Sequence, residues 1–137
     1  MPEASFPATL DRLDDMVAFI LDFATQQGFD QAVVMKVRLA AEEVLVNIIN
    51  HAYPDGAGSI HIACAPGGDG SSGLTLEIRD TGLPFNPLEK EEPDVSLPME
   101  EREIGGLGIF LTRKVMDDIQ YRREGDANIL KLVKHAK

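Results

Sequence analysis

Apolar residues recur at the spacing of an α-helix over two stretches in the first half of the chain. The first stretch runs from about Thr9 to Gln27, where apolar side chains return every three or four positions and therefore share one helical face. We expect Thr9 or Asp11 to cap the start of this helix and Gly28 to end it. The residues predicted to lie on its apolar face are Leu13, Val17, Phe19, Ile20 and Phe23.

A second helix is predicted to begin after Asp30, whose side chain suits an N-cap, and to end at Pro54-Asp55-Gly56. Apolar residues again recur at helical spacing along its length, which predicts that one side of this helix is buried. The residues expected on that inner side are Val33, Val34, Val37, Ala40, Ala41, Leu45, Ile48 and Ile49.

Alternating apolar and polar residues predict strands in the rest of the chain. We expect a short first strand at residues 5–8, two strands at 59–65 and 73–80 joined by the turn-rich residues 66–72, and strands near 119–124 and 128–134. A third helix is predicted over about residues 106–116. The pattern favours one α+β domain over residues 1–137, a two-layer α/β sandwich with a mostly antiparallel mixed sheet of about four or five strands against about three helices.

Composition and charge exclude several classes of protein. The formal net charge of −10 would repel phosphates, so we expect no direct binding to nucleic acid. No apolar run reaches the ~18 residues that a membrane span needs, and the first residues lack the basic and apolar regions of a signal peptide. Cys64 is the single cysteine and cannot form an internal disulfide, which fits a cytoplasmic location. Its place in an alternating strand predicts a small core residue and not a nucleophile.

Polar side chains interrupt the second predicted helix in a regular way. Glu43 and Asn47 are four residues apart and therefore stack on one helical face, and Asn50 and His51 continue the same stripe. Glu42 is about a hundred degrees around the helix from Glu43, so we expect it to be solvated. A packing helix would carry apolar residues at most of these positions. The stripe therefore predicts a surface that offers oxygen ligands and a base.

Two further motifs flank an unusual acidic segment. From Leu88 to Glu103 there are seven acidic and two basic residues, a net charge of −5. Such a long segment without periodicity is typical of a solvated loop or of a lid over a ligand. Asp80-Thr81-Gly82 precedes it, and Gly105-Gly106-Leu107-Gly108 follows it and runs into the third predicted helix. Glycines at a helix N-terminus let backbone N–H groups approach a phosphate.

These three motifs, in this order, resemble those of the GHKL, or Bergerat, ATP-binding fold, and more closely the bacterial anti-sigma factor serine kinases of the RsbW type. The helix stripe resembles the family's N box, and Glu43, Asn47, His51, Ala52 and Tyr53 stand at its motif positions. Asp80 to Pro87 is similar to the G1 box, and Gly105 to Asp117 is similar to the G2 box. Pro84 stands where many members of the wider superfamily have a second glycine, which is usual in the anti-sigma branch.

The resemblance implies a role for each motif residue. Asn47 would coordinate Mg²⁺ through its amide oxygen, and Glu43 would be the general base that takes the proton from an acceptor hydroxyl. Asp80 would accept a hydrogen bond from the adenine amino group of ATP, and Gly82 would give the ring room. The residues that would line the triphosphate are Gly105, Gly106, Leu107 and Gly108, under an ATP lid at about residues 85–105.

Some of these residues have a simpler interpretation. Glu43 alone could be an exposed helix carboxylate, and Asn50 fits either a supporting role at the nucleotide or an ordinary surface position. We expect His51 to support the helix end, since no zinc-ligand pattern accompanies it.

At the level of the whole protein, the resemblance implies an anti-sigma factor with serine/threonine-protein kinase activity. Its partners would be a sigma factor and a STAS-domain anti-anti-sigma protein, which it would phosphorylate with ATP and Mg²⁺. Members of this family often form homodimers. The alternative on the same fold is a non-catalytic, ATP-dependent module that binds partner proteins.

Overall fold

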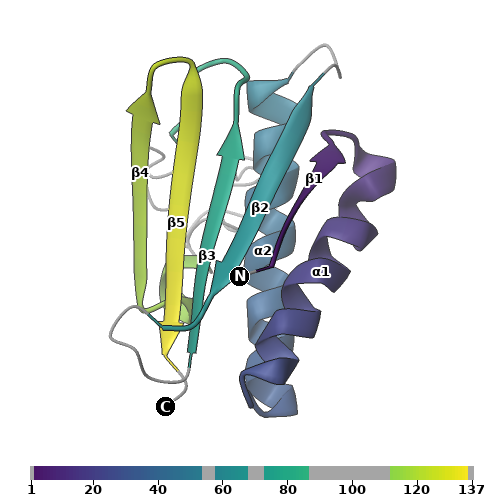
Figure 1. The fold of residues 1–137 in the computed structure, drawn as a ribbon, viewed down its shortest axis with the longest axis vertical. Helices are drawn as coiled ribbons and strands as arrows, with labels where there is room; N and C mark the ends of the chain where they lie inside the picture. Colours follow the sequence, from purple (N-terminus) through teal and green to yellow (C-terminus); the bar gives the residue numbers. More distant parts are fainter. Residues whose placement is uncertain (1, 54–57, 68–72, 87–111, 136–137) are drawn as a thin grey trace, which may run out of the picture.

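Five antiparallel strands form one sheet in the order β1-β2-β3-β5-β4 (Figure 1). The computed structural model describes residues 2–53, 58–67, 73–86 and 112–135. The strands are β1 Glu3–Pro7, β2 Ser59–Ala65, β3 Gly73–Asp80, β4 Asp118–Glu124 and β5 Ala127–His135. All four pairings between neighbouring strands are antiparallel, so the expectation of a mostly antiparallel sheet is confirmed.

Two helices cover one face of the sheet and make the second layer. They are α1 Leu13–Gln26, preceded by the 3-10 turn η1 Leu10–Arg12, and α2 Gln31–Ala52. In Figure 1 both helices lie beside the same side of the sheet, and α2 runs toward the end where β3 finishes. The α+β sandwich predicted from the sequence is therefore confirmed.

The core lies between these two layers. Met16 and Ile20 of α1 and Leu45 of α2 are fully buried, and they belong to one cluster with alternate residues of β2 and β3 such as Ile62 and Leu76. Because neighbouring residues of a strand point to opposite faces, only every second residue reaches this cluster. The helical and strand periodicities that predicted the core residues are borne out.

Local chemistry explains where the helices begin and end. The Asp30 carboxylate accepts a hydrogen bond from the Val33 amide at 2.9 Å, as predicted for an N-cap. Gly28 follows α1 with φ +88°, a conformation that disfavours side chains. The predicted cap of α1 was wrong: Thr9 precedes η1 without a side-chain cap, because its hydroxyl donates to the Asp11 carboxylate instead.

Two predicted elements differ from the structure or extend beyond it. The first strand begins at Glu3, two residues earlier than expected, because its whole length pairs with β2 from Glu3↔Ala63 to Pro7↔Ser59. The third predicted helix lies mostly outside the described residues, although residues 112–115 are helical.

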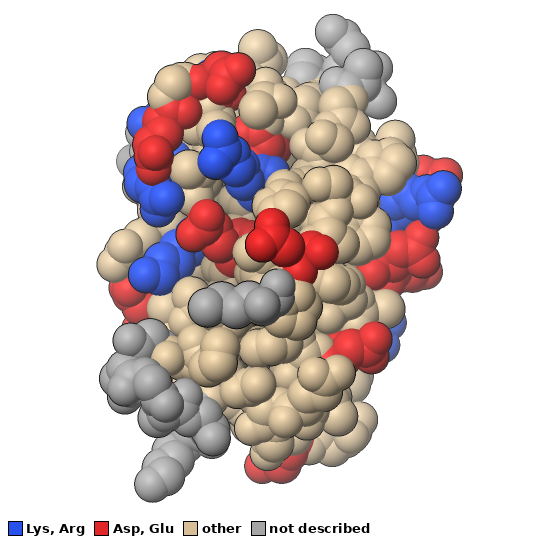
Figure 2. Space-filling view, in the orientation of Figure 1, with Lys and Arg blue, Asp and Glu red and all other residues tan. Residues whose placement is uncertain are grey.

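The other face of the sheet carries alternating charges. Figure 2 shows acidic and basic side chains interspersed over part of this face and a large uncharged area over the rest. Arg122 and Glu124 form an ion pair on β4, and Glu3 of β1 contacts His61 of β2 at 2.9 Å. In the part of the chain that the structure describes, no helix is long and apolar enough to cross a membrane.

Candidate functional site

Asp80 is a buried carboxylate at the end of β3. Only 3% of its surface is exposed, and its Oδ1 atom accepts hydrogen bonds from the Gly82 amide at 2.9 Å and from the Asn128 side chain at 2.8 Å. Burial raises its pKa, while the hydrogen bonds from Asn128 and Gly82 and the nearby charge of Arg123 act in the opposite direction. A buried acid with a perturbed pKa at a strand end is typical of a functional site.

Asn128 stands directly opposite Asp80 in the pairing of β3 with β5. Its Nδ2 atom donates to Asp80 and also to the Leu83 carbonyl, both at 2.8 Å. Its Oδ1 atom accepts from the Tyr121 hydroxyl at 2.5 Å and from Arg123 at 3.1 Å. This side chain therefore links three strands to the residues that follow Asp80.

The C-terminal end of α2 is fastened to the same place. The Tyr53 hydroxyl donates to the Ser59 carbonyl at 2.7 Å and accepts from the Thr81 amide at 2.8 Å. The Leu83 amide donates to the Ala52 carbonyl, also at 2.8 Å. These bonds join the C-terminal end of α2, which is the helix that carries the polar stripe, to the end of β3 that carries Asp80.

Gly82 has a packing role in addition to the one that the resemblance implies. A Cβ atom at this position would lie 2.3 Å from the Ala52 carbonyl oxygen, and the φ angle of Gly82 is not positive. The glycine therefore allows β3 and the end of α2 to approach each other. The structure does not test its predicted role of giving the adenine ring room.

The polar stripe of α2 has a buried part and an exposed part. Asn47 is 4% exposed, and its Nδ2 atom donates to the Glu43 carbonyl at 2.9 Å. Because a carbonyl only accepts, the amide must donate through Nδ2 at this contact, and Oδ1 does not take part in it. Glu43 is half-buried and Asn50 is exposed.

Glu42 and His51 have the structural roles expected of them. Glu42 forms an ion pair with Arg38 at 2.8 Å, one turn earlier on the solvent side of α2. The His51 ring stacks on Phe85 with 4.7 Å between ring centroids and 19° between planes. His51 therefore supports the end of the helix against the residues that follow β3.

The amide oxygen of Asn47 could be one ligand of a metal ion whose other ligands are water or phosphate oxygens. Among the described residues there is no group of three or more His, Cys, Asp or Glu that could hold a metal ion. Mg²⁺ is commonly held by one or two protein oxygens together with water and substrate phosphates, and an amide oxygen such as that of Asn47 fits it. The predicted phosphate-contacting residues Gly105, Gly106, Leu107 and Gly108, and most of the predicted lid, lie outside the described residues.

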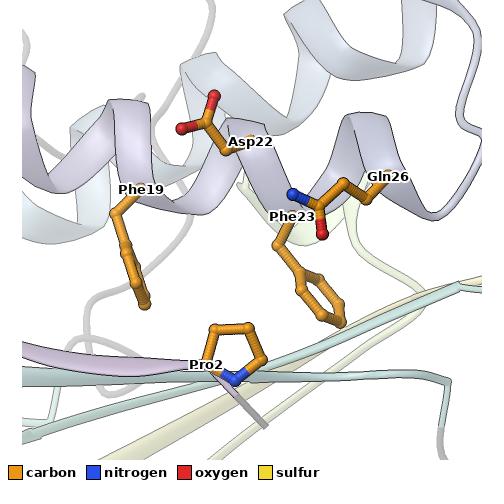
Figure 3. Close-up of a pocket in the computed structure, with 5 residues that line it drawn as sticks. All are labelled: Pro2, Phe19, Asp22, Phe23 and Gln26. Atoms are coloured by element: carbon orange, nitrogen blue, oxygen red, sulfur yellow. The ribbon is translucent and has the colours of Figure 1, made fainter.

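A separate hollow of about 210 Å³ lies between α1 and the start of β1. Figure 3 shows Phe19 and Phe23 extending from α1 toward Pro2, and Asp22 and Gln26 also line the hollow. No residue of the three motifs lines it.

Sequence reasoning missed the residues of β4 and β5 that surround Asp80. Asn128 is one of four polar residues of β5, with Lys131, Lys134 and His135, so it is a weak signal by itself. The signal becomes specific only with the strand register that places it opposite Asp80. Arg123 and Tyr121 are on the neighbouring strand and have no distinguishing sequence pattern.

Comparison with known proteins identifies the family of the chain. Residues 6–134 match the histidine kinase-like ATPase domain. The chain belongs to this family. Among curated proteins it is similar to the serine-protein kinases RsbW of Bacillus thuringiensis (strain Al Hakam) and Bacillus anthracis, each 29% identical over 132 residues that cover 93% of this chain and 81% of the relative.

A solved structure confirms the fold. The chain is similar to a structure of the RsbU and RsbW domains of Rv1364c from Mycobacterium tuberculosis, with a TM-score of 0.61 and 14% identity. The similarity covers 98% of this chain and 32% of that chain. At this identity the likeness concerns the fold.

Proposed function

We propose that this protein is an ATP-binding anti-sigma regulatory factor with serine/threonine-protein kinase activity. It would phosphorylate a STAS-domain anti-anti-sigma protein, bind a sigma factor, and act in the cytoplasm. The observation that carries the proposal is the buried Asp80 carboxylate, held at the end of β3 and fastened through Tyr53 to the helix that bears Glu43 and Asn47. The family match and the kinase names of its relatives support it.

Asp80 is suited to recognise an amino group on a nucleobase. Both donors that reach it among the described residues bond to Oδ1, so Oδ2 remains as an acceptor. An ionised carboxylate only accepts hydrogen bonds, and the 6-amino group of adenine is a donor. Asp80 would therefore anchor ATP by its base.

Glu43 and Asn47 would act at the other end of the nucleotide. The Asn47 amide oxygen would hold Mg²⁺, which supplies neutralisation of the charge that develops during phosphoryl transfer. Glu43, one turn earlier on the same helix, would take the proton from the acceptor serine or threonine hydroxyl. We include in the proposal the lid at about residues 85–105 and the contacts of residues 105–108 with the triphosphate.

The decisive experiment uses the full chain, [γ-³²P]ATP with Mg²⁺ and a STAS-domain protein from the same cell. We expect label on a serine or threonine of the STAS protein. Glu43→Ala should lower the transfer rate by about 10²-fold or more, as expected for loss of a general base. The matched control is Glu42→Ala, because Glu42 is the adjacent carboxylate and is paired with Arg38.

The possible results distinguish a protein kinase from a non-catalytic module that binds partner proteins. Equal transfer by the wild type and Glu43→Ala would contradict the base assignment. ATP binding without any transfer would favour the non-catalytic partner-binding module. Undetectable binding of Mg²⁺-ATP to the wild type would refute the proposal.

Asn47 has its own test in the same preparation. Asn47→Ala should lose most of the gain in ATP affinity that Mg²⁺ gives to the wild type, because the variant lacks the amide oxygen. Titration calorimetry with Mg²⁺ and with EDTA measures that gain, and an undiminished gain would contradict the metal role.

A further inference from the structure

The carboxamide of Asn128 is the most heavily bonded side chain around Asp80. It is 4% exposed, and all its polar atoms are engaged. Nδ2 donates to Asp80 and to the Leu83 carbonyl, and Oδ1 accepts from Tyr121, from Arg123 and, at 3.3 Å, from the Phe85 amide. Because Asp80 and the Leu83 carbonyl only accept, while Arg123 and the Phe85 amide only donate, these partners fix the orientation of the amide.

This network fixes the plane in which the Asp80 carboxylate lies. Asn128 and the Gly82 amide both donate to Oδ1. Rotation of the carboxylate out of its present plane would break both hydrogen bonds in a buried place, where unsatisfied polar groups are costly. The carboxylate is therefore held with Oδ2 as its remaining acceptor.

The same carboxamide also holds the residues that follow β3. It bonds to the backbone of Leu83 and of Phe85, and the Phe85 ring in turn stacks on His51 at the end of α2. A side chain on β5 thus fixes both the carboxylate and the start of the connection that leaves the strand.

We infer that Asn128 is a positioning residue for nucleobase recognition: it orients Asp80 toward the 6-amino group of adenine without touching the nucleotide. This inference rests on the proposed function. It predicts that loss of Asn128 weakens recognition of the amino group itself, beyond any general loosening of the site.

The first test compares two nucleotides on one variant. ATP and purine riboside triphosphate differ only in the 6-amino group, and their dissociation constants are measured with Mg²⁺ by calorimetry. The wild type should favour ATP, and Asn128→Ala should reduce that preference by about tenfold, which is the effect of roughly one hydrogen bond to a charged group. The matched control is Gln120→Ala, an exposed carboxamide on β4 that bonds only to Asp118 among the described residues.

The ratio of the two dissociation constants distinguishes a positioning role of Asn128 from a general structural role. A fold that is merely loosened would lose affinity for both nucleotides equally and keep the wild-type ratio. An unchanged ratio in Asn128→Ala would overturn the inference. Should this variant fail to fold, Tyr121→Phe removes one donor to the same amide oxygen and should lower the ratio by a smaller factor.

The second test needs no nucleotide. Burial raises the pKa of Asp80 and the Asn128 hydrogen bond opposes that effect, so Asn128→Ala should raise the pKa further, with Arg123 as the charged group that still faces the carboxylate. A ¹³C NMR titration of the Asp80 carboxyl measures the change. An unshifted titration would contradict the inference.

The two proposals fail in different ways. Failure of the wild type to bind ATP would refute the proposed function, while the carboxyl titration would still test the contact between Asn128 and Asp80. Normal ATP binding by the wild type, with an unchanged ratio and an unchanged titration in the variant, would refute only the role of Asn128.

Discussion

Asp80 is the residue at which stability and binding oppose each other. Its pKa is raised in the folded protein, so the folded state holds its proton more tightly than the unfolded state does. The stability from this group is therefore present below the unfolded pKa, which is near 3.8, and is lost as the pH rises through the folded pKa. Above the folded pKa, the ionised carboxylate therefore lowers the folding stability.

Asp80→Asn should make this opposition measurable. At pH 7 we expect the variant to be more stable than the wild type in urea unfolding, because a neutral amide replaces a buried charge and still offers an oxygen to Asn128 and Gly82. The difference should shrink as the pH falls below the folded pKa of Asp80. ATP affinity should fall by about tenfold or more with the loss of a charged acceptor.

The control for this prediction is Asp118→Asn, which changes an exposed carboxylate at the start of β4. It should alter unfolding free energy by less than about 0.5 kcal/mol. A wild type that is more stable than Asp80→Asn at pH 7 would show that the hydrogen bonds outweigh burial at Asp80.

At the scale of elements, Tyr53 joins α2, β2 and β3 through one hydroxyl. Tyr53→Phe keeps the ring but leaves the Ser59 carbonyl and the Thr81 amide without this partner. We expect a loss of about 1–3 kcal/mol in unfolding free energy by urea titration. Thr9→Ala is the control, since the Thr9 hydroxyl contacts only the exposed Asp11 carboxylate among the described residues.

The contact of Gly82 with the end of α2 gives a second prediction at this scale. Gly82→Ala places a methyl group against the Ala52 carbonyl, and we expect a loss of about 1–3 kcal/mol from the forced separation. Gly125→Ala would place its methyl group in open space, and its only strain comes from the φ angle of +58°. We therefore expect it to lower the free energy of unfolding by about 1 kcal/mol. Equal losses of unfolding free energy in the two variants would mean that the end of β3 can move away from α2 without strain.

The sequence predicted those elements whose signal is local. Helical spacing identified both long helices, and alternation identified β2 and β3 at the bounds that the structure shows. The first strand was less well placed, because its length is set by pairing with β2 and not by its own residues. The cap of α1 was missed because the Thr9 hydroxyl has a competing acceptor two residues later.

The residues of the candidate site also differ in whether a local sequence pattern indicates them. Glu43 and Asn47 are on one helix, and Asp80 ends a predictable strand, so local pattern was sufficient to select them. Asn128 became visible only through the register of two strands separated by almost fifty residues. Long-range pairing of this kind leaves no periodic trace in one sequence.

At the scale of the whole molecule, charge should shape how a nucleotide approaches. The chain carries a net charge of −10, and the triphosphate of ATP is also anionic. Without Mg²⁺, we expect ATP affinity to rise with added NaCl, because screening shortens the Debye length from about 30 Å at 0.01 M to about 8 Å at 0.15 M. Calorimetry in EDTA at the two salt concentrations tests this, and a falling affinity would indicate a locally basic site.

The buried position of Cys64 has a practical consequence. This single thiol is fully buried in β2, and burial raises its pKa to about 11. Thiolate is the reactive form, so alkylating reagents should modify the protein only through molecules that have transiently opened. The chain thus contains a natural reporter of its own opening, and ATP should slow the labelling of Cys64 if the nucleotide binds the closed state.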